Sequence, residues 1–216
     1  FEGYDGVIDG LWERSYKDML DQIVDEGFNT IRLPFAGESL TFTPNTTDPN
    51  AANYTYIGSP GNTIYTDNVD FLGKTTLQMM DLVVDYADEI GLDVVLDHHR
   101  MSLGDGTENG LWYNDTYSVD DWVNGWKLLA TRYAGYDNVI GADIQNEPYN
   151  GTWGGGGATD WALAAEMAGN AILQVNPNWL IFVEGVANYN DNGTNTSYWW
   201  GGNLIGVADR PIDLDL

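Results

Sequence analysis

The sequence predicts an α/β fold in which amphipathic helices alternate with buried parallel strands. Four segments carry apolar residues at helical spacing, and each one leads into a short apolar run. The helix and strand pairs are residues 15–27 and 28–35, 75–91 and 92–100, 118–135 and 138–148, and 159–177 and 178–186. The runs VVLD and LIFV are apolar at successive positions, which is typical of strands that helices bury on both faces.

The first unit shows how each helix is recognised. Ser15 is a candidate N-cap, and Gly27 ends the pattern because glycine readily adopts the left-handed backbone that closes many helices. Four apolar residues at helical spacing lie between them, namely Met19, Leu20, Ile23 and Val24. Tryptophans inside the later helical segments are expected in the core, and these are Trp122, Trp126 and Trp161.

Each predicted strand ends in polar residues. These are Arg32 in the first strand, His98 and His99 in the second, Asn146 and Glu147 in the third, and Glu184 in the fourth. Both a closed (β/α)8 TIM barrel and a doubly wound open sheet contain such helix–strand units. The barrel is favoured because its strand ends converge on one mouth, and because no strand is followed directly by a Gly-rich phosphate-binding turn.

Four strands do not close an eight-stranded barrel, which commonly takes ~250 residues. We therefore interpret residues 1–216 as one partial domain, an incomplete barrel that covers about strands two to five.

Composition narrows the possible partners. Asp and Glu number 33 against 8 Lys and Arg, a net charge of −25 that would repel nucleic acid and anionic membranes. The chain is either an ordinary acidic protein or one adapted to concentrated salt, and we favour the second. Cysteine is absent, so disulfides and thiolate chemistry are excluded. No run of ~20 apolar residues predicts a membrane span.

Six Asn-X-Ser/Thr sequons are compatible with secretion, and we expect an extracellular protein. They begin at Asn45, Asn53, Asn114, Asn150, Asn192 and Asn195.

The third strand carries the strongest chemical signal. Glu147 stands at its end next to Asn146 and Pro148, where a cleft lined by aromatic side chains would keep a carboxylic acid protonated for proton transfer. Asn146 would donate to a substrate hydroxyl, and Pro148 would stiffen the chain. The alternative is a structural carboxylate paired with an arginine.

The charged groups of the first two strands have two interpretations each. Arg32 lies within an apolar run and needs a carboxylate partner, either a catalytic glutamate or an internal ion pair. His98 and His99 are adjacent, so their side chains point to opposite faces and do not easily share a metal ion. A single inward histidine that donates to a sugar hydroxyl or a carboxylate is favoured, and no metal or cofactor is expected.

Aromatic residues indicate the substrate. The chain has nine Trp and 13 Tyr, and several follow strands, where exposed rings would stack on the apolar faces of sugars. The candidates for sugar binding are Trp112, Trp153, Trp199 and Trp200. A carboxylate, an amide and stacking aromatics at a barrel mouth together predict hydrolysis of a polysaccharide or oligosaccharide.

These motifs occur in one known family. The segments NTIRLPF, LDHHR, NVIGADIQNEP, NPNWLIFVEGV and SYWWGGNL follow its order, so the chain resembles glycoside hydrolase family 5, in particular the endo-β-1,4-glucanases, or cellulases. The resemblance implies a retaining hydrolase without metal or cofactor. It assigns Glu147 as general acid/base, Asn146 as a contact of the sugar 2-hydroxyl, Arg32 as the residue that holds the nucleophile, and His99 as the strand-three histidine. Trp199 and Trp200 resemble part of the sugar-stacking surface.

The chain also departs from the family pattern. The resemblance places the nucleophilic glutamate on strand seven, which is missing here, and gives Glu184 of strand five a supporting role. We expect residues 1–216 to be a partial glycoside hydrolase catalytic domain that is inactive by itself. The alternatives are a β-mannanase or exo-glucosidase of the same family, and a non-catalytic carbohydrate-binding protein.

Overall fold

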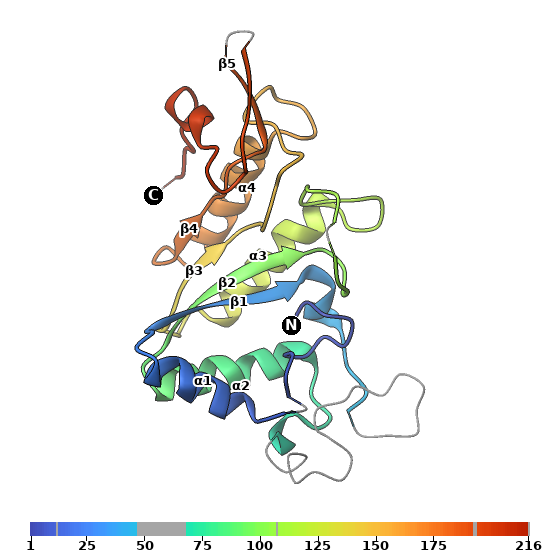
Figure 1. The fold of residues 1–216 in the computed structure, drawn as a ribbon, viewed down its shortest axis with the longest axis vertical. Helices are drawn as coiled ribbons and strands as arrows, with labels where there is room; N and C mark the ends of the chain where they lie inside the picture. The colour runs from blue at the N-terminus through green and yellow to red at the C-terminus, as the bar shows by residue number, and fades with distance from the viewer. Residues whose placement is uncertain (12, 47–67, 107, 192–193, 216) are drawn as a thin grey trace. The chain divides into compact units, whose positions relative to one another are not determined.

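A computed structural model describes residues 1–11, 13–46, 68–106, 108–191 and 194–215 (Figure 1). Sequons Asn53 and Asn192 lie outside this part. The predicted alternation is confirmed, with helices α1 (Tyr16–Asp25), α2 (Thr76–Glu89), α3 (Val119–Arg132) and α4 (Trp161–Leu173) between strands β1 (Thr30–Ala36), β2 (Asp93–Arg100), β3 (Val139–Asp143) and β4 (Leu180–Phe182). A hairpin of β5 (Asn188–Asp191) and β6 (Thr194–Ser197) follows, and short 3-10 turns η1 (Gly37–Thr41), η3 (Val69–Phe71) and η4 (Ile205–Ala208) complete the elements.

Each helix begins at a side chain that accepts a backbone N–H. The predicted cap Ser15 accepts from the Asp18 amide at 3.0 Å, and Gly27 follows α1 with a left-handed φ of 91°. The α2 and α3 helices begin with reciprocal capping boxes at Thr75 and Ser118. These local bonds explain why the helix starts could be predicted from the sequence.

The strands form one sheet in the order β1-β2-β3-β4. β3 and β4 pair in parallel with Gly141 opposite Leu180, where a side chain on Gly141 would collide with the Leu180 carbonyl. The expected burial on both faces is confirmed for Val94, Val95 and Leu96 of β2. It is wrong for β4, the last strand in the order, where Leu180 remains 57% and Phe182 41% exposed.

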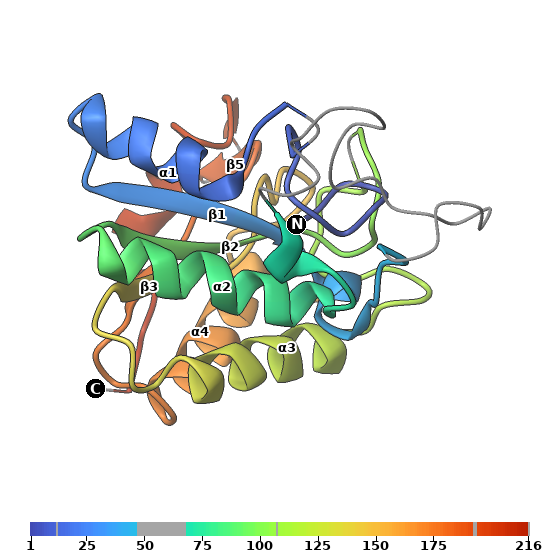
Figure 2. The same cartoon turned by 90° about the horizontal axis from the view of Figure 1, so that it is seen from below.

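The residues divide into two compact units. The first contains Phe1–Leu96, Ser102–Asp105 and Asp137–Val139. In it α1 and α2 run alongside β1, as Figure 2 shows. Tyr16 stacks on Phe71 at 4.7 Å and donates its hydroxyl to Asp70, and burial raises its pKa.

The second unit contains Asp97–Met101, Gly106–Tyr136 and Ile140–Leu216. Its core lies where α3 packs against α4, and the predicted core residues Trp122, Trp126 and Trp161 are all buried there. The indole N–H groups of Trp122 and Trp126 both donate to the Ile144 carbonyl, at 2.9 and 3.1 Å. Helix packing therefore holds the segment that leaves β3.

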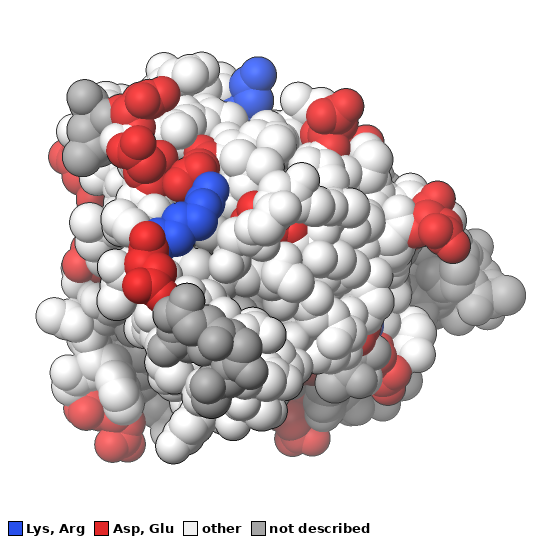
Figure 3. Space-filling model, turned by 90° about the horizontal axis from the view of Figure 1, so that it is seen from above, with Lys and Arg blue, Asp and Glu red and all other residues white. Residues whose placement is uncertain are grey.

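On the face drawn in Figure 3, acidic side chains are spread widely and basic ones are few, as the charge of −25 requires. Within the described residues, no helix combines the length and apolarity needed to cross a membrane.

Candidate active site

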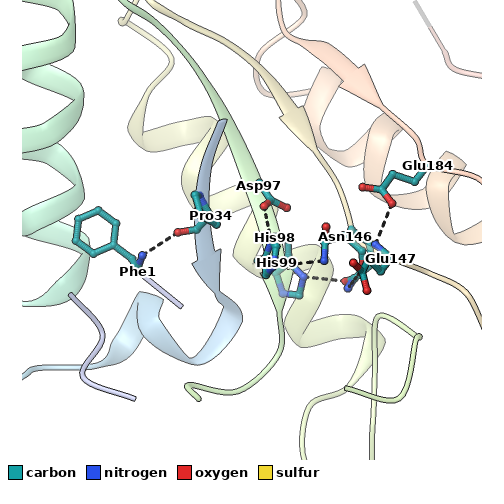
Figure 4. Close-up of polar contacts among 9 residues, drawn as sticks. Phe1, Pro34, Asp97, His98, His99, Asn146, Glu147 and Glu184 are labelled. Atoms are coloured by element: carbon teal, nitrogen blue, oxygen red, sulfur yellow. Dashed lines mark hydrogen bonds and ion pairs between the residues drawn. The ribbon is translucent and has the colours of Figure 1, made fainter. Parts of the chain in front are cut away.

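The site is built where β2 and β3 end. β3 stops at Asp143. The Ile144 carbonyl, which accepts the two indole N–H groups, comes next, and Gln145, Asn146 and Glu147 follow it. The Asn146 amide donates to the His98 carbonyl at 3.0 Å, so the chain beyond β3 still pairs with the end of β2 (Figure 4). Two backbone anchors thus place the Asn-Glu pair beside the two histidines.

The last residues of β2 alternate between two sides, as predicted. Asp97 and His99 share one side, and the His99 Nδ1 lies 2.7 Å from Asp97 Oδ2. His98 points the other way, where it is buried against the rings of Tyr117 and Trp126 at 5.8 and 6.5 Å. Only His99, which is partly exposed, presents its ring to the candidate site.

His98 contacts the site indirectly, through the side chain of Gln145. Its Nδ1–H donates to Gln145 Oε1 at 2.8 Å, and Gln145 Nε2 donates to the Asn146 carbonyl at 3.1 Å. Burial lowers the pKa of His98 to about 4, against a smaller opposing effect of the Gln145 hydrogen bond. The imidazole is therefore neutral at pH 7.

The Asn146 side chain meets His99 directly. Its Nδ2 lies 3.4 Å from His99 Nε2. Because the Asp97 carboxylate accepts the Nδ1 proton, Nε2 of a neutral His99 is an acceptor and the Asn146 amide is the donor. Asp97, His99 and Asn146 form one hydrogen-bonded row that determines which way the amide faces.

Glu147 adopts an unusual backbone. Its φ is 50°, in the left-handed region, and its N–H donates to Glu184 Oε2 at 3.0 Å. Its carbonyl accepts the Tyr149 N–H at 2.8 Å. Glu184 follows β4, and the Trp161 indole donates to its carbonyl at 2.8 Å. The Glu147 side chain is partly exposed, so its carboxyl can reach a ligand.

Two of the four predicted sugar-binding tryptophans, Trp199 and Trp200, are at least partly exposed. Trp199 is 64% exposed and lies 5.7 Å from the partly exposed Trp200, whose ring is 6.1 Å from that of Tyr149. Tyr149 is held by its hydroxyl, which donates to the Glu108 carbonyl. A row of rings therefore starts two residues after Glu147, which fits the predicted stacking role of Trp199 and Trp200.

The predicted stacking role is wrong for the other two. Trp112 is 1% exposed and packs against Trp161 and Trp122 at 5.1 and 6.1 Å. Trp153 is 8% exposed, and its indole donates to the Arg210 carbonyl. Both stand in loops, where exposure was expected, but these loops fold back onto the helices and η4. Their rings are already occupied by protein contacts.

Arg32 lies in the first compact unit. The sequence placed it within an apolar run, and the structure shows the residue exposed. Arg32 belongs to the leading residues of β1, the first strand in the sheet order, and these residues are only partly covered. The role of Arg32 toward a nucleophile stays a prediction.

Gln145 links His98 to Asn146 and was not among the predicted site residues. Its position one residue before the Asn-Glu pair was the available signal. Within the described part of the chain, no cluster of three or more His, Asp or Glu side chains is placed to hold a metal ion.

The chain matches a protein family model over nearly its whole length. A family model described as Cellulase (glycosyl hydrolase family 5) matches residues 1–215. An endoglucanase of Paenibacillus polymyxa is 45% identical over 212 residues, which are 97% of this chain and 49% of the relative. The major extracellular endoglucanase of Xanthomonas campestris is 37% identical over 99% of this chain and 41% of its own length. The chain thus spans about half the length of the curated relatives it matches.

Solved structures show the same fold. The catalytic domain of the X. campestris endoglucanase aligns with a TM-score of 0.82 and 37% identity, over 100% of this chain and 58% of that one. A hyperthermophilic endocellulase from Pyrococcus horikoshii aligns with a TM-score of 0.79 and 40% identity, over 99% and 58%. The prediction of an incomplete (β/α)8 barrel is confirmed, with β1 to β4 as its strands.

Proposed function

Because the chain belongs to glycosyl hydrolase family 5, we propose that its protein hydrolyses β-1,4-glucosidic bonds in cellulose or related β-glucans with retention of configuration. The relatives from P. polymyxa and X. campestris are named endoglucanases. A P. horikoshii endocellulase, 40% identical to this chain, is described in complex with cellotetraose. These names support a cello-oligosaccharide or a glucan polymer as the ligand.

The observation that carries the proposal is the anchoring of Asn146 and Glu147. Asn146 is bonded through its backbone to His98 and faces His99 with its side chain, while Glu147 is bonded to Glu184. Residues at the ends of the neighbouring strands β2, β3 and β4 thus hold one amide and one carboxyl beside exposed aromatic rings. This arrangement suits a substrate that offers hydroxyls, an apolar ring face and an oxygen to be protonated.

In the proposed reaction, Glu147 gives its proton to the glycosidic oxygen as the bond to the anomeric carbon breaks. A second carboxylate attacks that carbon from the opposite face, and the resulting glycosyl ester is hydrolysed by a water that Glu147 deprotonates. Asn146 binds a sugar hydroxyl, and Trp199 and Trp200 stack on the sugar rings. Retention needs the two carboxyl groups ~5–5.5 Å apart. We assign the second one to sequence outside residues 1–216, as the family resemblance implies.

The role of Glu147 as the general acid can be tested with two substrates whose leaving groups differ in their need for a proton. In the full-length protein, Glu147→Gln should lower kcat/KM on cellotetraose by about 100-fold or more, since general acid catalysis contributes 10²–10⁴-fold. A dinitrophenyl cellobioside needs little protonation, so its kcat/KM should change far less. The exposed Glu89 of α2 provides the control, and Glu89→Gln should match the unchanged protein. Near-normal hydrolysis of cellotetraose by Glu147→Gln would disprove the assignment.

Two further measurements separate the alternatives. Relative rates on mannan, cellulose and cello-oligosaccharides distinguish a glucanase from a β-mannanase or an exo-glucosidase. Residues 1–216 alone should bind cellotetraose without cleaving it. Release of reducing sugar from carboxymethyl cellulose by this segment would contradict the assignment of the nucleophile to another part of the protein.

We also propose that the protein is secreted into a high-salt environment. Secretion is supported by the polymeric substrate and by the name of the X. campestris relative, a major extracellular endoglucanase. The salt adaptation is supported by the charge of −25, because dense carboxylates repel one another unless ions screen them. The melting temperature should therefore rise from 0.1 to 2 M KCl. A melting temperature that salt leaves unchanged would exclude the adaptation.

A further inference from the structure

Glu147 is the only non-glycine residue with a positive φ in the described part of the chain. A left-handed backbone is unfavourable for a residue with a Cβ, and it persists only where surrounding contacts enforce it. The conformation also determines where the side chain points. A return from 50° to the ordinary α region near −60° would turn the Cα substituents by about 110° about the N–Cα bond. The carboxyl would then leave its present place.

Two hydrogen bonds flank the left-handed residue. The Glu147 N–H donates to Glu184 Oε2 at 3.0 Å, and the Glu147 carbonyl accepts from the Tyr149 N–H at 2.8 Å. The second bond belongs to the local turn around the buried Pro148. The first is the long-range one, since it joins residues 37 positions apart on different strand ends.

Glu184 is itself held firmly. Its carbonyl accepts the Trp161 indole N–H at 2.8 Å. The next residue, Gly185, lies so close to the carbonyl oxygens of Trp200 and Asn203 that a Cβ there would overlap both. The backbone that carries Glu184 is thus packed from two sides, and its carboxylate is presented to Glu147 from a rigid position.

We propose that Glu184 is a positioning residue for the acid. Its carboxylate accepts the Glu147 N–H, stabilises the left-handed backbone and so aims the Glu147 carboxyl at the departing oxygen. This inference rests on the proposed function, because it gives Glu184 a task only if Glu147 transfers a proton. Glu184 acts through Glu147 and does not touch the substrate.

The test uses Glu184→Gln and Glu184→Ala in the full-length protein. Gln keeps a carbonyl oxygen that accepts the Glu147 N–H, whereas Ala removes the acceptor. On cellotetraose, Glu184→Ala should lower kcat/KM by about tenfold or more, and Glu184→Gln should restore most of it. On the dinitrophenyl cellobioside, kcat/KM of both variants should stay within about twofold of the unchanged protein, since this step needs little acid.

A variant that merely disturbs the folded structure should lose activity on both substrates alike. Glu166→Ala is the matched control, because Glu166 of α4 pairs with Arg210 and accepts the Asp213 N–H, at 3.1 Å each. It should affect the two substrates equally. Equal losses on both substrates for Glu184→Ala would overturn the positioning role. If Glu147→Gln also lacks a leaving-group dependence, the proposed function fails instead.

Hydrogen exchange provides a readout that needs no activity. The Glu147 amide should be protected in the unchanged protein and in Glu184→Gln, and it should exchange faster in Glu184→Ala. Unchanged protection in Glu184→Ala would show that other contacts hold this amide and would also overturn the proposal.

Discussion

Asp97 and His99 lie on the same side of β2, with His99 Nδ1 2.7 Å from Asp97 Oδ2. Because Asp97 is fully buried while His99 is partly exposed, the pair joins the interior of the protein to the site. The carboxylate keeps the proton on Nδ1 and leaves Nε2 to accept from Asn146 at 3.4 Å. The orientation of the Asn146 amide is therefore coupled to a residue that no substrate touches.

Asp97→Asn should weaken this coupling. An amide can present its NH2 group to His99 and so favour the other tautomer, which turns Nε2 into a donor that faces the Asn146 NH2 group. Since a hydrogen bond to a charged group contributes about 1.5–3 kcal/mol, kcat/KM on cellotetraose should fall by about 10- to 100-fold.

The matched control is Asp93→Asn, which makes the same change four residues earlier in the same strand. It should leave kcat/KM unchanged. Equal activity of Asp97→Asn and Asp93→Asn would show that the row from Asp97 to Asn146 does not position the substrate.

His98 should make stability depend on pH. Its pKa is about 4 in the folded protein and 6.5 when unperturbed, so the unfolded chain binds more protons between these values. The free energy of unfolding therefore contains a contribution that is present above pH 6.5 and is lost as the pH falls toward 4. The full shift corresponds to about 3 kcal/mol.

Denaturant unfolding at pH 7 and pH 4.5 tests this dependence. The unchanged protein should lose about 2 kcal/mol more than His98→Gln between the two pH values, because the variant has no group to protonate there. The difference between the proteins is the measured quantity, since other carboxylates contribute to both. Parallel pH profiles would mean that His98 is not buried in its neutral form.

Trp199 and Trp112 should respond oppositely to truncation. Trp199 is 64% exposed, so Trp199→Ala should weaken cellotetraose binding while the melting temperature changes little. Trp112 is buried between other indoles, so Trp112→Ala should lower the free energy of unfolding by about 3–5 kcal/mol. Calorimetric titration and thermal melts measure the two effects. Unchanged sugar affinity in Trp199→Ala would remove the stacking role.

Local features of the sequence predicted much of this molecule. The Ser15 cap, the Gly27 terminus and the strand that ends in Asn146 and Glu147 follow from interactions among neighbouring residues, namely caps, glycine backbone freedom and apolar periodicity. The opposite directions of His98 and His99 follow from the pleat of a strand. These effects act between residues a few positions apart, so they can be predicted from the sequence without knowledge of the tertiary structure.

Tertiary packing decided the rest. The burial of Trp112 and Trp153, the exposure of Arg32, and the contact from Glu184 to the Glu147 amide each depend on segments far apart in sequence. No local pattern encodes which residue will cover a loop tryptophan or which carboxylate will meet a distant N–H. Local sequence patterns thus predicted which groups stand at the strand ends. The packing of helices and loops around those ends determined which side chains are solvent-exposed and how Glu147 is held.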